Sequence, residues 1–453
     1  MEENGIEVSV SDGCREKVCC RLEMVVGDNS GVHDIAGYYR AFRNTQRVCR
    51  VCYESTEEIQ KWFRSSAFQL RTKEKYEVEA DIIESEGHHS EVLKLFGLHR
   101  RCPLNKLNSF HCVTGIPLDV THDIFEDGVA KHAVEQFLTA LVDRKVVTLN
   151  TINELIDTFN FHRTDGNKPQ PCGARRGKVL VKKTCSEMWT LLRLLPLMVS
   201  LAIHFDALPS DIKVLWKTIT SLISIVQIIM SPSIQSSDVD RLEIMVEEWL
   251  KKFHATFPNF ALKPKFHYLV HYPNCIRMHG PPARYATIRF EAKHSDMKKF
   301  LKFSKNTRNV CKTMANAHQL AMCSREVSSS EDETGLEESN HMERVCLGCY
   351  TYSVGDAVRT TTGDFIRVLY FTRDGAGCFA SGLRLLDTQF IQHLSAMTFT
   401  EGPRTLCHVS DLSPIRPIAQ WVYFRSSAAL FVEGKPLVVA WPNFVHVLSG
   451  VFW

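Results

Sequence analysis

Two cysteines and two histidines are spaced as ligands of a transition-metal ion. Cys49 and Cys52 form a CxxC pair, and His267 and His271 form an HxxxH pair more than two hundred residues later. Thiolate sulfur and imidazole nitrogen are the donors that zinc takes in tetrahedral structural sites, and such a site uses four of them. The pattern predicts one closed Cys2His2 zinc site that joins two distant segments. The alternative is a chance coincidence among 16 cysteines and 19 histidines.

The helix that is predicted to carry the histidine pair lies between two prolines. Pro264 stands where a helix can begin, and Pro273 is expected to end it. Residues four apart lie on one face of a helix, so both imidazoles are expected to point the same way. This spacing favours a shared metal ion.

Two acidic residues flank the zinc pattern and are candidates for catalysis. Asp28 ends a segment, residues 21–28, whose pattern predicts a short strand followed by a turn. Glu291 lies on a helix predicted over residues 283–303. The alternatives are an aspartate that begins a turn and a solvated glutamate that pairs with a lysine of its own helix.

A second group of metal-ligating side chains lies between the two halves of the zinc pattern. Asp119, His122, Asp123 and Glu126 fall at i, i+3, i+4 and i+7, on one face of a helix. Such a face is able to bind a metal ion. The alternative, which is the more ordinary one, is the start of a helix with Asp119 as its cap and acids in the favourable end of the helix dipole.

Basic residues concentrate around the histidine half of the pattern. Residues 263–312 contain twelve lysines and arginines and two acids, whereas the whole chain has a formal net charge of +3. A local excess of positive charge favours contact with DNA phosphates, and the alternative is an ordinary solvated helix face. No helix-turn-helix or compact zinc finger for reading bases is recognisable. The candidate DNA-binding residues are Arg284, Arg289, Lys293, Lys298, Lys299, Lys302 and Lys305.

Composition and cysteine usage narrow the class of protein. With 453 residues, 44% hydrophobic and 23% charged, the chain is expected to be globular, with two or three domains. The first ten residues carry three acids and no apolar run, so secretion is not expected. The cysteines then indicate reduced thiols and metal ligation. Two apolar stretches, residues 189–205 and 216–230, are short for membrane spans and are predicted to be buried helices.

The order of the predicted elements gives an α+β fold that is mainly helical. Residues 1–52 hold the predicted strand and the CxxC pair, and residues 53–262 form a large helical region. Residues 263–323 carry the HxxxH helix and those that follow it, and residues 324–344 form an acidic, serine-rich linker. Residues 345–453 change to period-two patterning between turns, which predicts a small β-barrel or β-sandwich. Within the helical region, apolar spacing predicts helices over residues 118–141, 150–161, 185–205, 211–230 and 237–257.

The ordered series of motifs resembles a family of DNA transposases. Residues 27–29 (GDN), the CxxC pair, residues 117–126 (PLDVTHDIFE), the HxxxH pair and residues 289–294 (RFEAKH) follow one another. This series is similar to the transposases of CACTA-type (En/Spm) transposons and covers roughly residues 20–320. Their layout is similar to that of the recombinase that rearranges antigen-receptor genes.

The resemblance implies a ribonuclease-H-like core that a large helical insertion divides. It implies that Asp28 and Glu291 are the second and third of three catalytic acids and that the two cysteines and two histidines bind a structural zinc. Three carboxylates in such enzymes hold two Mg²⁺ or Mn²⁺ ions for in-line displacement at a phosphodiester. The first acid has no match before Asp28, and Asp12 stands in a turn. A partial core, in an N-terminally truncated chain, is therefore expected.

We therefore expect a domesticated, transposase-derived protein that acts by binding DNA, mainly through phosphates, or by interaction. Its ancestral reaction is metal-dependent cleavage and transfer of DNA strands, which two acids out of three are expected to impair. One alternative is an active transposase or nuclease that another chain completes. The other is a zinc-stabilised interaction scaffold that binds no nucleic acid. A nuclear location follows from the first expectation and a cytoplasmic one otherwise. Homo-oligomerisation and a partner for the β domain stay open.

Overall fold

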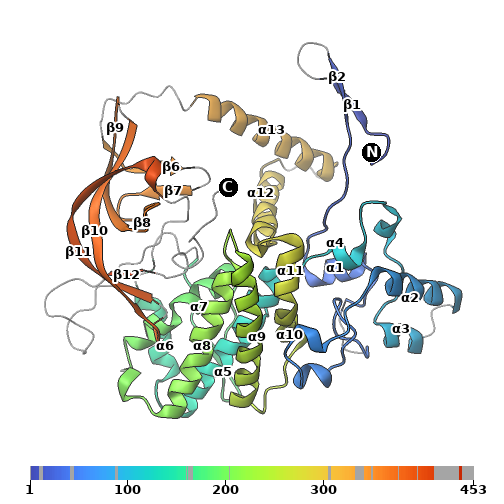
Figure 1. Ribbon diagram of the computed structural model, residues 1–453, viewed down its shortest axis with the longest axis horizontal. Coiled ribbons are helices and arrows are strands. Elements are labelled where there is room, and N and C mark those ends of the chain that lie inside the picture. Colours follow the sequence, from blue (N-terminus) through green and yellow to red (C-terminus); the bar gives the residue numbers. More distant parts are fainter. Residues whose placement is uncertain are drawn as a thin grey trace.

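The computed structural model is an α+β structure, mainly helical, with a β-sheet region near the C-terminus, as the sequence predicts (Figure 1). It describes residues 2–9, 14–40, 45–86, 90–159, 161, 167–203, 205–304, 308–331, 341–347, 350–375, 377–394, 396–412 and 438–440. The helical bundle lies between an N-terminal region and the sheet.

The N-terminal region packs around a small apolar cluster of its own. Its centre holds Tyr38, Tyr76 and Leu98, all buried, and the hydroxyl of Tyr76 donates to the carbonyl oxygen of Ala36 at 2.7 Å. Because a buried hydroxyl needs a hydrogen-bond partner, this bond holds the helix that contains Tyr76 against Ala36, the residue that follows the first helix. The elements are the hairpin β1 (Ile6–Ser9) and β2 (Arg15–Val18), and the helices α1 (Asn29–Ile35), α2 (Lys73–Glu86), α3 (Ser90–Phe96) and α4 (Cys112–Gly115).

The predicted strand over residues 21–28 is wrong. These residues have irregular backbone, and Asp28 is the N-cap of α1, where Oδ1 accepts the backbone N–H of Gly31 at 2.7 Å. A short apolar run becomes a strand only beside a partner strand, and this segment has none among the described residues. The strands that precede it, β1 and β2, form an exposed hairpin. The partial ribonuclease-H-like core therefore stays a prediction.

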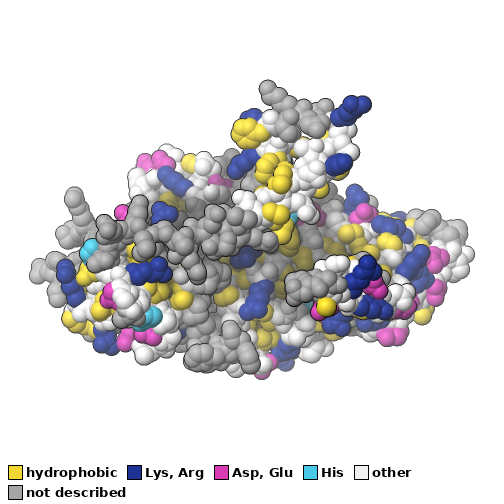
Figure 2. All heavy atoms as spheres, turned by 90° about the horizontal axis from the view of Figure 1, so that it is seen from above, with side chains coloured by type: hydrophobic (Ala, Val, Ile, Leu, Met, Phe, Trp, Pro, Cys, Tyr) yellow, Lys and Arg dark blue, Asp and Glu magenta, His cyan; other side chains and the backbone are white. Residues whose placement is uncertain are grey.

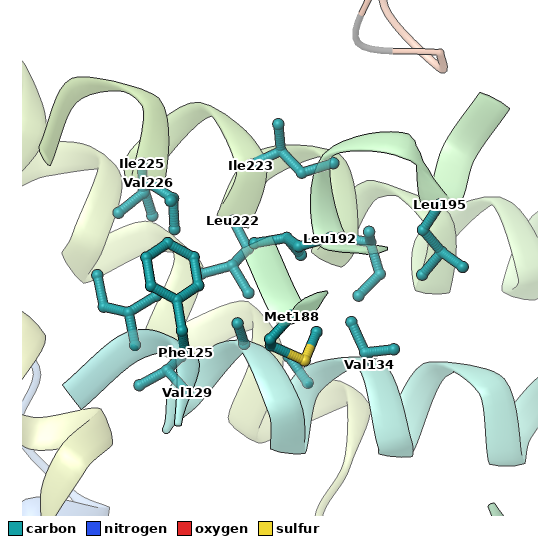
Figure 3. Packing of buried hydrophobic residues seen from close by; sticks show 14 of the residues in the cluster. Phe125, Val129, Val134, Met188, Leu192, Leu195, Leu222, Ile223, Ile225 and Val226 are labelled. Atoms are coloured by element: carbon teal, nitrogen blue, oxygen red, sulfur yellow. The ribbon is translucent and has the colours of Figure 1, made fainter. Parts of the chain in front are cut away.

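The helical bundle contains the main hydrophobic core. Figure 3 shows Val134, Met188 and Leu222, from three different helices, packed into one cluster. Trp249 is buried among them, and its Nε1 donates to the carbonyl oxygen of Thr218 at 2.8 Å. The helices are α5 (Val129–Asp143), α6 (Leu149–Thr158), α7 (Cys185–Ser200), α8 (Ser210–Ile229) and α9 (Ser236–Thr256). Helices predicted over 211–230 and 237–257 thus lie within one residue of the observed bounds, because apolar periodicity governs both the pattern and the packing.

Helix α8 is long and apolar enough to cross a membrane by length and composition alone. Its most apolar 18-residue window is 67% buried within the protein. Packing against α9 and α5 accounts for this composition, since the apolar face of a helix in a large core is buried against its neighbours.

Among the described residues, the helices that follow the bundle carry the histidine pair, Glu291 and most of the predicted DNA-binding residues. The histidine pair spans α10 (Pro264–Tyr268) and a 3-10 turn, η9 (Leu269–His271). That helical segment ends at His271, before Pro273 as predicted, and Pro273 lies in the first turn of the next helix, α11 (Tyr272–His279), where its missing N–H is not needed. Then come α12 (Ile288–Ser304) and α13 (Val310–Glu331). Helix α13 extends into the predicted linker, and residues 332–340 lie outside the described residues.

The C-terminal region forms an antiparallel sheet in the order β12-β11-β10-β9-β5, with β8 also paired to β9, and a separate two-stranded sheet of β6 and β7. It meets the bundle at Trp216, whose Nε1 donates to the carbonyl oxygen of His393 at 2.6 Å. Residues 413–437 and 441–453 are outside the description. The strands are β5 (His341–Met342), β6 (Arg344–Leu347), β7 (Tyr350–Ser353), β8 (Ala357–Arg359), β9 (Phe365–Asp374), β10 (Gly377–Ile391), β11 (Ala396–His408) and β12 (Val438–Ala440).

Candidate metal centre

The two halves of the predicted zinc pattern meet in the structure. Cys49, Cys52, His267 and His271 are all buried, and their ligand atoms lie within 4.8 Å of one another. Nε2 of His267 is 3.1 Å from Sγ of Cys52 and 3.0 Å from Nε2 of His271. Two thiols and two imidazoles that converge in this way are the donor set of a structural zinc site.

The surroundings of these four side chains fit a closed site. The ring of Phe68 covers the cluster, with its centroid 4.7 Å from that of His267 in an edge-on contact. The backbone N–H of Val51 donates to Sγ of Cys49 at 3.2 Å. An amide hydrogen bond to sulfur favours the thiolate, which is the form that binds metal. Since all four donors are buried, a bound zinc would have a structural role.

The pKa shifts of Cys49, Cys52 and His271 are also suited to a cation. Burial opposes ionisation of Cys49, but the Cys52 thiol and the two imidazoles outweigh it and lower the pKa of Cys49 well below its usual range. Burial raises the pKa of Cys52 and lowers that of His271, so one thiol and one neutral imidazole face the thiolate. A zinc ion would supply the positive charge that ionises the second thiol.

Arg50, between the two cysteines, ties the CxxC loop to the rest of the structure. Its Nη1 donates to Oδ1 of Asn29 at 2.5 Å and its Nη2 to the carbonyl oxygen of Pro117 at 3.0 Å. Nδ2 of Asn29 in turn donates to Oδ1 of the buried Asp123 at 2.7 Å. Burial raises the pKa of Asp123 to about 6, against the opposing charge of Arg50. This network joins α1, the CxxC loop and residues 119–126.

Glu291 lies beside His122 in the structure. Its Oε1 is 3.3 Å from Nε2 of His122, and Glu126 Oε2 is 3.9 Å from the same nitrogen. Among the described residues, no ion pair joins Glu291 to a lysine of its own helix. Partial burial raises the pKa of Glu291 against the opposing effect of His122. The ligand atoms of His122, Glu126 and Glu291 lie within 4.8 Å of one another, a second group able to hold a metal.

Asp28 is not part of either metal-ligating group among the described residues. Its side chain is exposed and caps α1, while the next residue, Asn29, turns toward Asp123. The structure therefore brings Glu291 to His122 and Glu126 and not into one cluster with Asp28. The predicted catalytic pair, as a pair of ligands to one ion, is not formed in the described structure.

Residues 119–126 are not one helical face. Thr121–Phe125 is a π-helical turn, η6, and π turns are frequent at functional sites. Asp119 acts as the predicted cap, because it accepts the backbone N–H groups of Thr121 and His122 at 3.3 Å each. The wider turn directs His122 toward Glu291 and leaves Asp123 buried against Asn29.

The predicted DNA-binding residues lie mostly on α12. Arg289, Lys298, Lys299 and Lys302 are exposed, and Lys293 is half-buried. Arg284 precedes the helix, and its Nε donates to the carbonyl oxygen of Pro232 at 3.0 Å. Lys305 lies outside the described residues. Acidic and basic side chains are both spread over the face seen in Figure 2, so positive charge is not confined to α12.

Several residues of the site were not assigned a role from the sequence. Thr287 holds Asp119 through its backbone N–H, at 3.1 Å, and through its hydroxyl, at 2.7 Å. Tyr272 donates to Asp123 at 3.3 Å. A buried arginine within a CxxC loop, as at Arg50, is a sequence signal for such a network, because a buried guanidinium requires several acceptors. Thr287 and Tyr272 carry no comparable signal.

Comparison of the chain with models of known protein families gave no match, and comparison with curated proteins gave none. The class of protein is therefore defined by the fold and the site themselves. It is an α+β protein whose buried Cys2His2 cluster is able to bind a metal such as zinc.

Proposed function

We propose that this chain is a transposase-derived, zinc-stabilised protein of the nucleus that binds DNA phosphates along α12. The observation that carries the proposal is the convergence of Cys49, Cys52, His267 and His271 in one buried cluster. A CxxC and an HxxxH pair joined over 215 positions are expected from the CACTA-type resemblance and are improbable as a chance pairing. The excess of basic residues that follows the histidine pair supports the phosphate contact.

Helix α12 offers a stripe for phosphate contact. Lys298 and Lys302 follow Glu291 by seven and eleven positions, which on a helix is the same face. Both lysines are exposed. Each lysine that neutralises a phosphate releases counterions from DNA, so binding through this stripe would be salt-dependent and largely independent of base sequence.

The geometry favours binding over catalysis. A two-metal reaction needs carboxylates that share the ions, and here Asp28 caps α1 while Glu291 meets His122. The described residues therefore do not fit the ancestral pair of Mg²⁺ or Mn²⁺ ions, and no catalytic step is derived through them. Zinc at the Cys2His2 cluster would hold the CxxC loop against α10 and thereby fix the start of the basic region.

Fluorescence anisotropy with a duplex DNA tests the proposal. The zinc-loaded full chain is expected to bind at about 50 mM salt, with an affinity that falls as salt rises. Replacing Lys298 and Lys302 by glutamine should weaken binding and lower the salt slope by about 0.9 for each lost phosphate contact. The matched control replaces Lys61 and Lys106, which are exposed in the N-terminal region, by glutamine. The control variant and the test variant therefore have the same net charge. Absence of binding at low salt would overturn the proposal.

A DNA-nicking assay distinguishes DNA binding alone from the alternative of an active transposase or nuclease. Supercoiled DNA is incubated with the full chain and Mg²⁺ or Mn²⁺, beside the variant Glu291→Gln. We expect no cleavage above the level of that variant. Cleavage that disappears in Glu291→Gln would instead support a nuclease or transposase whose site is completed in another way.

A second candidate function is protein interaction, which exposed apolar side chains favour. Phe303 is 84% and Leu320 71% exposed, on α12 and α13 respectively. A hollow of about 340 Å³ between these helices is lined by Phe300, Met314 and other side chains. Exposed apolar groups that gather on neighbouring helices are typical of interaction surfaces. Retained zinc without any DNA binding would favour this function.

A further inference from the structure

His122, Glu126 and Glu291 converge from two elements that are distant in the sequence. His122 lies on the π turn η6, Glu126 follows that turn directly, and Glu291 lies in the first turn of α12. The Nε2 atom of His122 is 3.3 Å from Oε1 of Glu291 and 3.9 Å from Oε2 of Glu126. The three side chains are partly exposed, so a solute can reach them.

Asp119 fixes the orientation of the imidazole. Its Oδ2 is 2.6 Å from Nδ1 of His122, on the side of the ring opposite Nε2. Asp119 is buried, and its carboxylate also accepts the hydroxyl of Thr287 at 2.7 Å, so it is held firmly behind the ring. A carboxylate that accepts Nδ1–H leaves the Nε2 lone pair to face a metal, which is the arrangement seen behind most metal-ligating histidines.

The same aspartate positions the third side chain. Oδ1 and Oδ2 of Asp119 accept the backbone N–H and the hydroxyl of Thr287, at 3.1 and 2.7 Å. The backbone N–H of Ile288, the first residue of α12, donates to Oγ1 of Thr121 at 3.0 Å. These bonds hold the start of α12 against the π turn, so Glu291 is placed opposite His122 by a rigid support.

The negative charge around His122 favours the binding of a cation. The carboxylates of Glu126 and Glu291 have His122 as their ion-pair partner among the described residues, and Asp119 approaches the same ring from behind. One imidazole thus faces three carboxylates. Either a proton on Nε2 or a metal ion between Nε2 and the two glutamates relieves their repulsion.

We propose that Nε2 of His122 and the carboxylates of Glu126 and Glu291 bind a divalent cation of the Mn²⁺ type. One nitrogen and carboxylate oxygens, without sulfur, suit such a metal better than the thiolate-rich cluster does. Three ligands leave coordination positions open, which water or a phosphate oxygen can fill. The site omits Asp28 and rests on geometry alone, so it is independent of DNA binding and of the proposed ancestry.

Mn²⁺ itself is the probe, because it is paramagnetic and binds weakly to thiolate sites that hold zinc. The zinc-loaded full chain is titrated with Mn²⁺, and free ion is measured by electron paramagnetic resonance. We expect one Mn²⁺ per chain. Each of His122→Gln and Glu291→Gln should weaken binding at least about tenfold, and Asp119→Asn, which removes no ligand, by about 10–100-fold.

Asp127→Asn is the matched control, since Asp127 is a neighbouring acid whose carboxylate pairs with Lys131 and not with His122. Its affinity for Mn²⁺ should equal that of the unmodified chain. Zinc content and circular dichroism report on folding for every variant. The proposal is overturned if no Mn²⁺ binds up to about 1 mM, the upper range for weak cation sites, or if His122→Gln binds it equally well.

Discussion

The Sγ atom of Cys52 lies 3.1 Å from Nε2 of His267, although 215 positions separate the two residues in the sequence. A metal bound at this point would close a long loop, and a link that closes a long loop restricts the unfolded chain more than one that closes a short loop. The contact also brings the N-terminal region against α10. The predictions that follow concern this junction and the contacts that support it.

Removing a zinc ligand should destabilise the chain. Cys49→Ser is expected to reduce bound zinc from one equivalent to less than about half and to lower the free energy of unfolding by several kcal/mol, because structural zinc contributes folding free energy directly. Metal analysis and thermal unfolding measure both effects, and a strong chelator should reproduce them in the unmodified protein. The exposed Cys311→Ser is the control and should change neither. Unchanged stability after complete zinc removal would contradict a structural role.

Arg71 should be important for holding the CxxC loop. Its Nη1 is 3.5 Å from Oε2 of Glu79, and its Nε and Nη2 donate to the carbonyl oxygens of Cys49 and Phe96. Both ionic side chains are almost fully buried. Arg71→Met leaves the carboxylate of Glu79 without its ion-pair partner. We expect the free energy of unfolding, measured with denaturant, to fall by about 3–5 kcal/mol.

Arg64→Met provides the comparison for that substitution. Arg64 pairs with Glu247 at 2.8 Å, but its side chain is 57% exposed. Solvent screens such an exposed ion pair, so Arg64→Met should change the free energy of unfolding by no more than about 1 kcal/mol. Equal losses for the two arginines would argue against a special role for the buried pair.

Acid should destabilise the fold through His33. Burial, and then the charge of Arg50, lower the pKa of His33 from 6.5 to about 3. In the unfolded chain His33 is protonated below about pH 6.5, whereas in the folded chain it is protonated only below about pH 3. The free energy of unfolding therefore falls as pH decreases from about 6.5 to about 3, and the contribution of His33 is constant below that pH. The slope from this group is at most about 1.4 kcal/mol per pH unit.

Unfolding by urea at several pH values measures this effect. His33→Gln should remove its share of the slope, so that the difference between variant and unmodified chain grows toward neutral pH and shrinks toward pH 3. Any acid sensitivity of a bound zinc would be common to both proteins and would cancel in the difference. Parallel curves for the two proteins would contradict the assignment to His33.

The junction between the bundle and the sheet should depend on one indole. Nε1 of Trp216 donates to the carbonyl oxygen of His393, whose ring stacks on Phe205 with centroids 4.3 Å apart. Trp216→Phe removes the donor and should lower stability by about 1–3 kcal/mol, because the carbonyl loses its partner. Trp62→Phe is the control: Trp62 is 56% exposed and its replacement should cost no more than about 0.5 kcal/mol. Thermal unfolding compares the two, and similar shifts would contradict the contact.

The four donors of the candidate metal centre were predictable because their chemistry is local. CxxC and HxxxH are recognisable from residue type and spacing, and few other roles use that set. The bounds of α8 and α9 were predictable for a similar reason, since the spacing of apolar residues that indicates a helix lies within the helical segment itself. The strand predicted over residues 21–28 failed because a strand depends on a partner strand, which the segment itself does not encode.

The sequence by itself determined the mainly helical fold with a β region near the C-terminus, and the four donors of the candidate zinc site. Only the tertiary structure decided what Asp28 and Glu291 contact. Asp28 became a helix cap, and Glu291 came to face His122 across α12 and the π turn. The physical reason is range: donor type and periodicity are properties of a short segment, whereas the partner of a charged side chain is set by how distant segments pack.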